Sequence, residues 1–488
     1  MKKLFTVMSV IFIVVALFLT GCGSSSNNIT HGGDNPPPPP PPQDITVKIN
    51  GTCIYPDGVP IVGVTVNENS AIVTDVNGNF EIEVIVKKGQ EYLVPFAKEK
   101  FIFDGLKLTI DDSGNPIYDN TVIGFIPMTK GAKYRVSTPQ ITPNTFTYYI
   151  AISPDEKFMY AANGQQIYRI NLNTMQSVVI AGGGTDDSNG VAGEIAKFTS
   201  PRGLVVSPDG TTLYVTDYEL NKIKKITNVD TAQTAENTIV YTMAGTGTSG
   251  ANDNCAGSAA QFRLPQGLAI SPDSNILYVC DSQNFCIRKV TGIADAISAD
   301  NTQVSTIAGQ KGIEGQQDGT GNQAKFHQPL SIAVSKDGTT MYVTAANTAS
   351  DSNLRKITGL APSATAQNVT VTTLAGSIYG DNTLLPISGD QAIFRSIIGL
   401  TLSQDEDTAF ITDRNNNKIK VVKNIKNATT ASQTTVDLIA GTGIEGNEDG
   451  YETTATFNAP IDLQLLNNES VMYVACYNNP IRRIIATE

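Results

Sequence analysis

Short apolar runs recur between residues 150 and 488, and most are bounded by glycine, aspartate or serine. Apolar and polar positions alternate within many of these runs, which is typical of half-buried β-strands. Four such runs separate one copy of the tripeptide Ala-x-Phe from the next, and a repeat of this content is typical of a propeller blade. The tripeptide ends at Phe198, Phe262, Phe326, Phe394 and Phe457.

The first run of each repeat gives the number of blades. These runs begin at Ile150, Leu204, Leu268, Ile332, Leu400 and Leu463. Each sheet buries its faces only against its neighbours, so six of them are expected to close into a ring. The last repeat supplies three strands, whereas residues 132–137 form a strand-like run upstream without a partner. We predict that this run completes blade six, because the pairing would cover exposed strand edges.

Three motifs of the second repeat carry a family resemblance: Pro201-Arg202-Gly203-Leu204, Ser207-Pro208-Asp209-Gly210 and Leu213-Tyr214-Val215-Thr216-Asp217. With their counterparts in the other repeats they resemble the NHL repeat. This resemblance implies a six-bladed β-propeller over residues 128–488.

Residues 44–127 also alternate, but without the repeat. Strand-like runs at 45–49 and 80–84 accompany the turns Pro56-Asp57-Gly58 and Asp75-Val76-Asn77-Gly78. This stretch resembles the carboxypeptidase regulatory-like (prealbumin-type) β-sandwich, a module that commonly serves as a spacer. The expected fold class is therefore all-β, a six-bladed β-propeller preceded by a small β-sandwich domain.

The N-terminal segment is typical of an exported chain. Two lysines precede an apolar run over residues 4–19, and Leu19-Thr20-Gly21-Cys22 resembles the bacterial lipobox. We therefore predict a signal peptide at 1–21, a lipidated Cys22 that anchors the protein to a membrane, and a tether at 22–43. Seven consecutive prolines in that tether favour a stiff polyproline II stalk.

Charge and location narrow the classes of partner. The formal net charge of -12 argues against nucleic acid and against a grip on anionic headgroups. The expected location is the cell envelope. In a cell with two membranes, Gly23 favours the outer membrane, because an aspartate there would resemble an inner-membrane retention signal.

Five cysteines remain beyond the anchor, and an exported protein permits disulfides. Cys280 and Cys286 flank a short turn between two predicted strands. If these strands are antiparallel neighbours, the two thiols would face each other at bridging distance. The pair is our candidate disulfide, with free buried thiols as the alternative.

The candidate binding face lies where the inner strands begin. The residues between the opening proline and glycine positions are expected at the channel mouth, among them Arg202 and Gln266 with three apolar counterparts, Leu330, Ile398 and Ile461. His327, in the loop before an inner strand, is a further candidate. A recurring aspartate at the end of the second strand completes the set, at Asp217, Asp281 and Asp413.

These aspartates have two interpretations. Their carboxylate oxygens could contribute to a calcium site, whereas their repetition favours a structural role in turns. With two histidines in the chain, a multi-histidine zinc site is excluded. No Ser-His-Asp set or phosphate-binding loop is apparent, so no cofactor is expected, and whether any metal binds is left open.

The sequence thus favours a membrane-anchored extracytoplasmic binding or scaffold protein that presents its propeller to a protein or glycan partner. Such a role is more consistent with the residues than an enzymatic one. The alternative is a metal-dependent lactonase or lyase using carboxylates in the channel, because propellers similar to the NHL type include such enzymes.

Overall fold

The computed structural model describes residues 133–139, 141, 148–347, 352–377 and 385–487, together with nine strands between residues 12 and 119. The chain divides into two compact units, Met1–Pro127 and Met128–Ala486. Cys22 and the proline-rich tether lie outside the described residues. Within the described part of the chain, no helix has the length and apolarity needed to cross a membrane.

The described part of the first unit contains three antiparallel sheets. The longest pairing joins two of its strands from Asp44↔Lys87 to Thr52↔Asn79. The β-sandwich expected for this unit stays a prediction. In spatial order, the sheets are β1 (Phe12–Ala16), β2 (Asp44–Ile54) and β4 (Asn79–Lys87); β3 (Thr65–Val66), β6 (Phe96–Lys98) and β7 (Phe101–Ile102); and β5 (Glu91–Val94), β8 (Leu106–Ile110) and β9 (Pro116–Asp119).

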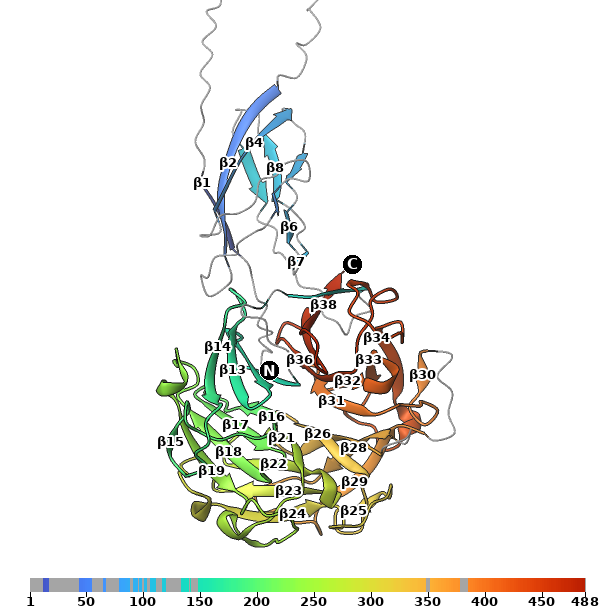
Figure 1. Cartoon of the computed structure of the whole chain (residues 1–488). Helices are drawn as coiled ribbons and strands as arrows, with labels where there is room; N and C mark the ends of the chain where they lie inside the picture. The colour runs from blue at the N-terminus through green and yellow to red at the C-terminus, as the bar shows by residue number, and fades with distance from the viewer. Residues whose placement is uncertain are drawn as a thin grey trace, which may run out of the picture. The chain divides into compact units, whose positions relative to one another are not determined.

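The second unit is the predicted six-bladed β-propeller, with its sheets following one another round a ring (Figure 1). The innermost strands are β11 (Tyr149–Ile152), β16 (Pro201–Val206), β21 (Pro265–Ile270), β26 (Gln328–Val334), β31 (Ile397–Leu402) and β36 (Pro460–Leu465). Each pairs antiparallel with a second strand: β12 (Phe158–Asn163), β17 (Thr212–Asp217), β22 (Ile276–Asp281), β27 (Thr340–Ala346), β32 (Thr408–Asp413) and β37 (Val471–Cys476).

The outer half of each blade adds two further strands. The third strands are β13 (Gln166–Asn171), β18 (Lys222–Thr227), β23 (Cys286–Thr291), β28 (Ser352–Thr358), β33 (Lys418–Lys423) and β38 (Arg482–Thr487). The fourth strands of blades one to five are β14 (Ser177–Gly182), β19 (Ile239–Ala244), β24 (Gln303–Ala308), β29 (Thr370–Ala375) and β34 (Thr435–Ala440). Short 3-10 helices fill some connections: η2 (Ala235–Asn237), η3 (Gly257–Ala259), η4 (Ser282–Asn284), η5 (Ala299–Asn301), η6 (Arg414–Asn416) and η7 (Ala431–Gln433).

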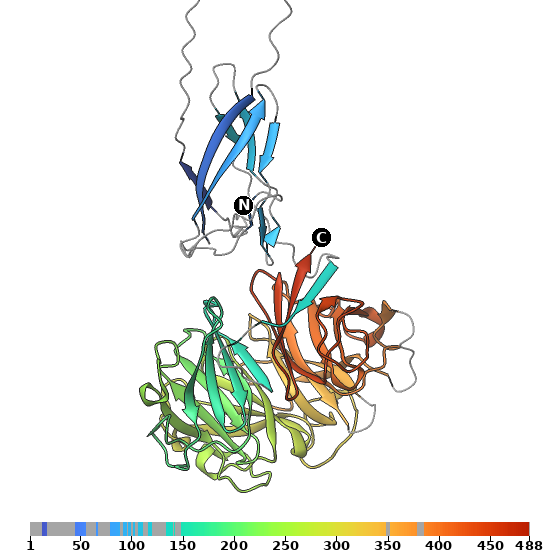
Figure 2. The ribbon, with the colours of Figure 1, turned by 45° about the horizontal axis from the view of Figure 1, so that its top comes forward.

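Blade six takes its fourth strand from the start of the propeller. β10 (Lys133–Ser137) lies beside β38, as Figure 2 shows for the cyan and red strands. The backbone N–H of Tyr134 donates to Glu452 Oε2 at 3.0 Å, and Arg483 Nε donates to Ser137 Oγ at 3.3 Å. The predicted closure by residues 132–137 is thereby confirmed.

Five blades also carry a short fifth strand at the outer edge, which the sequence pattern did not reveal. A run of two residues is too short to show the alternation of apolar and polar positions that indicates a strand. These strands are β15 (Val191–Ala192), β20 (Cys255–Ala256), β25 (Gly319–Thr320), β30 (Ile387–Ser388) and β35 (Gly450–Tyr451).

Buried cations of the third strands hold the loops of each blade. In five blades a lysine or arginine lies over the phenylalanine of Ala-x-Phe. Arg288 is fully buried and donates to Asp281 Oδ2 at 2.9 Å, Asp253 Oδ1 at 3.0 Å and the carbonyl of Asn252 at 2.8 Å. These basic side chains of the third strands therefore organise loops inside the fold.

The next basic position of the third strand links neighbouring blades. Lys225 donates to the carbonyls of Ala294 and Ala296 in the following blade, at 3.0 and 3.1 Å. Lys356 does the same toward Lys426 and Ala428, at 2.6 and 3.2 Å. Charged donors to otherwise unpaired carbonyls fix the order and spacing of the blades.

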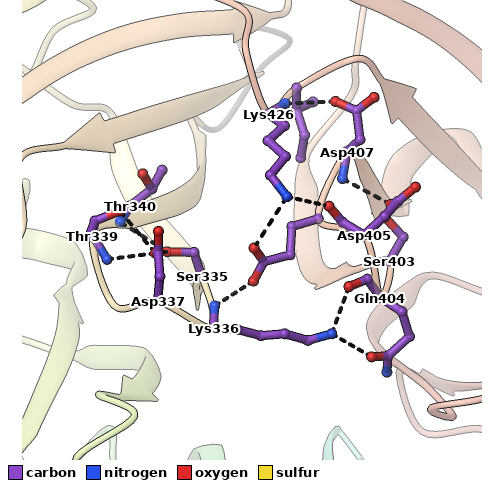
Figure 3. A network of polar contacts seen from close by, with 12 residues as sticks. Ser335, Lys336, Asp337, Thr339, Thr340, Ser403, Gln404, Asp405, Asp407 and Lys426 are labelled. Atoms are coloured by element: carbon purple, nitrogen blue, oxygen red, sulfur yellow. Dashed lines mark hydrogen bonds and ion pairs between the residues drawn. The ribbon is translucent and has the colours of Figure 1, made fainter. Parts of the chain in front are cut away.

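The turns between inner and second strands also join blade to blade. In three of these turns, the backbone N–H of the second residue donates to a glutamate side chain of the next blade. The pairs are Lys336 to Glu406, Gln404 to Glu469, and Asn467 to Glu156. Figure 3 shows this network where the turn with Lys336 meets the turn with Gln404 and Asp405. The glutamates all have positive φ, a conformation that is costly for residues other than glycine.

Blades one to three use a different pair at the same two places. Their turns have Pro154, Pro208 and Pro272, which lack the N–H, and the next blades have Gly210, Ser274 and Gly338 in place of glutamate. A Cβ at Gly338 would lie 3.1 Å from Cδ of Pro272. The contact between neighbouring turns is thus made in two ways. Either a proline packs against a small residue, or a backbone N–H donates to a glutamate.

We expect the two members of this contact to be energetically coupled. Glu406→Gly removes the acceptor of the Lys336 N–H, at a cost of about 1 kcal/mol, and relieves the positive φ of residue 406 by a similar amount, so this change alone is expected to alter the free energy of unfolding little. Adding Lys336→Pro recreates the pair found between blades three and four. In a double-mutant cycle followed by urea denaturation, a coupling of about 1 kcal/mol is expected, and additivity within about 0.3 kcal/mol would contradict it.

Candidate binding site at the channel mouth

The inner strands begin around a cavity of about 540 Å³ at one end of the propeller channel. All five residues predicted at the mouth line it: Arg202, Gln266, Leu330, Ile398 and Ile461. They converge because each is the second residue of its inner strand, apart from Leu330, which is the third. The volume is within the range of ordinary small-molecule sites, about 300–1,000 Å³.

One side of the cavity is built around Gln266. Its Oε1 accepts hydrogen bonds from Tyr149 Oη and from Arg202, both at 3.1 Å. The guanidinium of Arg202 lies over the ring of Tyr218, 3.4 Å from the ring centroid. These contacts hold a cation, an amide and a tyrosine face in fixed positions at the mouth.

The other side carries a second aromatic and arginine group. Tyr148 and Tyr477 have ring centroids 5.2 Å apart, and Tyr148 Oη donates to Asn478 Oδ1 at 2.7 Å. The guanidinium of Arg414 lies 5.4 Å from the Tyr477 ring centroid. Tyr477 is 45% exposed, so an aromatic face is accessible at the rim.

The residue that follows the second strand lines the mouth in five of the six blades. These residues are Gly164, Tyr218, Asn347, Arg414 and Tyr477. None of these five was predicted as a site residue from the sequence, although the recurring aspartates Asp217 and Asp413 directly precede two of them. The aspartates that end the second strands located the position in the sequence, but the residues after them share no residue type that would mark a site.

Burial affects the tyrosines of this group. Desolvation raises the pKa of Tyr149 to about 12, although the positive charge of Arg202 opposes the shift. Desolvation also raises the pKa of Tyr148. Tyr477 adds to this increase, whereas the positive charge of Arg202 opposes it. Both hydroxyls are therefore neutral at physiological pH and serve as hydrogen-bonding groups.

Below the mouth, the inner strands approach one another closely. A Cβ on Gly203 would lie 2.3 Å from the Gln266 carbonyl oxygen. Blade six has Asp462 at this position, and its two oxygens accept the N–H groups of Ile150 and Leu463, each at 2.9 Å. Burial raises the pKa of Asp462 to about 7, and the two N–H groups oppose the shift. Asp462 thus joins the last inner strand to the first.

The three recurring aspartates do not reach the binding face. Asp217, Asp281 and Asp413 are fully buried. Asp217 accepts the N–H groups of Thr199 and Ser200, both at 3.0 Å, in the loop that leads into the inner strand. Their placement corrects the binding-face assignment. The aspartates have a structural role, and most of their backbone N–H donors belong to the loop before the inner strand.

His327 also lies away from the cavity. Its Nδ1 is 2.9 Å from Glu314 Oε1, and the side chain is 12% exposed. Among the described residues, no cluster of three or more His, Cys, Asp and Glu side chains has an arrangement that would hold a metal ion. The six inner strands contain one carboxylate, Asp462, and its oxygens accept backbone N–H groups.

Cys280 and Cys286 are free thiols in the structure, contrary to the candidate disulfide. Their strands are antiparallel neighbours as expected, but the register pairs Cys280 with Ile287 and Asp281 with Cys286. Directly opposed residues share a face and successive residues alternate, so the two thiols lie on opposite faces of the hairpin. Burial raises the pKa of both thiols.

Two curated relatives show sequence similarity to this chain. The protein SUPPRESSOR OF QUENCHING 1, chloroplastic, of Arabidopsis thaliana is 31% identical over 189 residues, which cover 36% of this chain and 16% of that protein. NHL repeat-containing protein 2 of Homo sapiens is 24% identical over 301 residues, which cover 57% of this chain and 39% of that protein. The chain therefore spans only a minor part of either relative.

Solved structures share the fold at low sequence identity. A protein from Bacteroides thetaiotaomicron described as an auxiliary nutrient binding protein has a TM-score of 0.50 and 12% identity, with 90% of this chain and 94% of that chain covered. A putative phosphatase from the same organism gives the same four values. Residues 262–290, in blade three, match the NHL repeat family, so the chain contains an NHL repeat within its six-bladed propeller.

Proposed function

We propose that the protein is a lipid-anchored binding protein of the cell envelope whose propeller takes a glycan at the channel mouth. The observation that carries this proposal is the cavity of about 540 Å³, walled by tyrosines and lined by amide and guanidinium groups. Pockets with a few convergent polar groups are the usual sites of small-ligand binding. The description of one structural neighbour as a nutrient binding protein supports the same role.

The chemistry of the walls favours a glycan over a protein. Tyr148, Tyr218 and Tyr477 supply aromatic rings, which pack against the apolar faces of sugar rings while their hydroxyls bond sugar hydroxyls. Gln266, Asn347 and Asn415 add amide donors and acceptors. A concave site of this size encloses a short saccharide, whereas a protein interface of ordinary size is much broader.

The proposed anchor is Cys22, on the basis of Leu19-Thr20-Gly21-Cys22 and the preceding apolar run. Acylation at this cysteine would hold the propeller outside the cytoplasm, with the proline-rich tether as its stalk. Gly23 supports the outer membrane as the destination in a cell with two membranes.

Glycan binding is tested with the full-length protein in detergent on an array of neutral and charged oligosaccharides. Tyr218→Ala and Tyr477→Ala are each expected to weaken binding about 3- to 10-fold, because each removes one aromatic face. Tyr451→Ala is the control, since Tyr451 is 59% exposed and does not line the cavity. The proposal would be overturned if the protein bound no glycan on the array but did bind a protein partner. It would also be overturned if both variants bound glycan as tightly as the natural protein.

A further inference from the structure

We infer that the glycan bound at the channel mouth carries a carboxylate, which Arg202 and Arg414 bind from opposite sides of the ring. This inference rests on the proposed function and adds the class of ligand. Arg202 belongs to blade two and Arg414 to blade five, three blades apart in a ring of six. Both side chains line the same cavity.

Arg202 and Arg414, which are both partly exposed, differ from three fully buried arginines of the third strands. Arg288, Arg355 and Arg482 each form an ion pair with an aspartate and bond backbone carbonyls. Within the described part of the chain, neither Arg202 nor Arg414 forms an ion pair. A partly exposed guanidinium group without an ion-pair partner, at the mouth of a cavity, is available to bind an anion.

Both guanidinium groups are held in place before a ligand arrives. Arg202 lies over Tyr218 and donates to Gln266, and Arg414 lies over Tyr477. Stacking on a tyrosine limits the rotamers of the arginine while its remaining N–H groups stay available as donors. A planar fork of this kind matches a carboxylate, which accepts two parallel hydrogen bonds.

The charge around the mouth also favours an acidic sugar. The chain has a formal net charge of -12, yet the cavity lining contains two arginines and one carboxylate, Glu219. A neutral saccharide would not need two cations whose counter-ions are missing. Glu219 is exposed and is suited to accept hydrogen bonds from sugar hydroxyls beside the carboxylate. A uronic acid residue meets both requirements, because it combines a carboxylate with hydroxyls on one ring.

The experiment is isothermal titration of the full-length protein in detergent with three probes: trigalacturonate, its neutral counterpart galactotriose, and a sulfated galactose trisaccharide. We expect trigalacturonate to bind at least tenfold more tightly than either of the others. Arg202→Gln and Arg414→Gln are each expected to weaken its binding about 10- to 100-fold, since each removes a charge-assisted contact. Arg395→Gln, an exposed arginine of blade five outside the cavity, should bind normally.

Two further measurements separate recognition from folding and from the proposed function. The melting temperatures of both glutamine variants should match that of the natural protein, and Arg202→Lys should restore only part of the affinity, because lysine retains the charge without the fork. If galactotriose bound as tightly as trigalacturonate, the inference that the glycan carries a carboxylate would be overturned, while glycan binding itself would stand. Preference for the sulfated sugar would overturn it in favour of sulfate. If none of the three probes bound, the inference of an acidic glycan would also be overturned. The oligosaccharide array would then test the proposed glycan binding separately.

Discussion

Replacing Arg288 with methionine is expected to lower the free energy of unfolding by about 3–5 kcal/mol, the usual cost of removing one partner of a buried ion pair. The substitution leaves Asp281 and Asp253 buried beside an apolar side chain. Burial already raises the pKa of Asp281 to about 6 although Arg288 opposes the shift, so the natural pair is needed to keep this carboxylate charged. Urea denaturation at pH 8 measures the loss.

Arg482→Met is the matched control for this prediction. Arg482 is equally buried and lies over Phe457, but its carboxylate partner Asp449 is 52% exposed and regains water when the guanidinium is lost. We expect a smaller loss than for Arg288→Met. Equal losses would show that packing of the long side chain, rather than the buried charges, determines the effect.

The second large effect concerns the pH dependence of stability and Asp462. Its pKa of about 7 in the folded protein exceeds the ordinary value of 3.8. Between these values the folded state holds a proton that the unfolded chain releases, so Asp462 favours folding as the pH falls through 7 and opposes folding above it. The cost of the charged form at pH 8 is about 4 kcal/mol, because one pKa unit corresponds to about 1.4 kcal/mol.

Asp462→Asn removes this titration. At pH 4 Asp462 is protonated in the folded state and, like the amide, has one strong acceptor, so the variant should be about as stable as the natural protein. Between pH 4 and pH 8 it should gain up to about 4 kcal/mol relative to the natural protein, so that the two stability curves diverge as the pH rises. Denaturation series at pH 4, 6 and 8 provide the measurement.

Asp209→Asn serves as a control of opposite sign. The hydroxyl of Ser207 is the main cause that lowers the pKa of Asp209, so this carboxylate supports folding at neutral pH. Its replacement should lose stability relative to the natural protein as the pH rises through about 4, the ordinary range of aspartate. Parallel curves for Asp462→Asn and the natural protein would disprove the role of Asp462.

The repeats revealed the propeller because each blade has strands long enough to show alternation, and the unpaired run at residues 132–137 revealed how the ring closes. The inner-strand pattern also identified Arg202 and Gln266 as mouth residues. It failed for Asp217 and its counterparts, since a recurring carboxylate has the same sequence signature whether it binds a ligand or holds a loop. The contacts of Asp217 distinguish the two, and they depend on residues Thr199 and Ser200 of another segment.

The register of the hairpin at Cys280 and Cys286 was another limit of the sequence. A shift of one residue changes the face of every side chain, and the 3-10 turn η4 sets that shift. The rim residues Tyr218, Arg414 and Tyr477 were missed for a different reason. They are dissimilar in chemistry and share only a position after the second strand, so no conserved residue type marks them.

The composite sixth blade has a consequence for synthesis of the chain. Ser137 and Arg483, which meet in that blade, are 346 residues apart in sequence. On the ribosome, β10 is the first propeller strand to emerge and its partner β38 is the last, so the ring stays open until β38 has been synthesised. A truncated product would present unpaired edges at both sides of the missing blade, and such edges favour aggregation. Closure of the ring therefore depends on the propeller strand that is synthesised last.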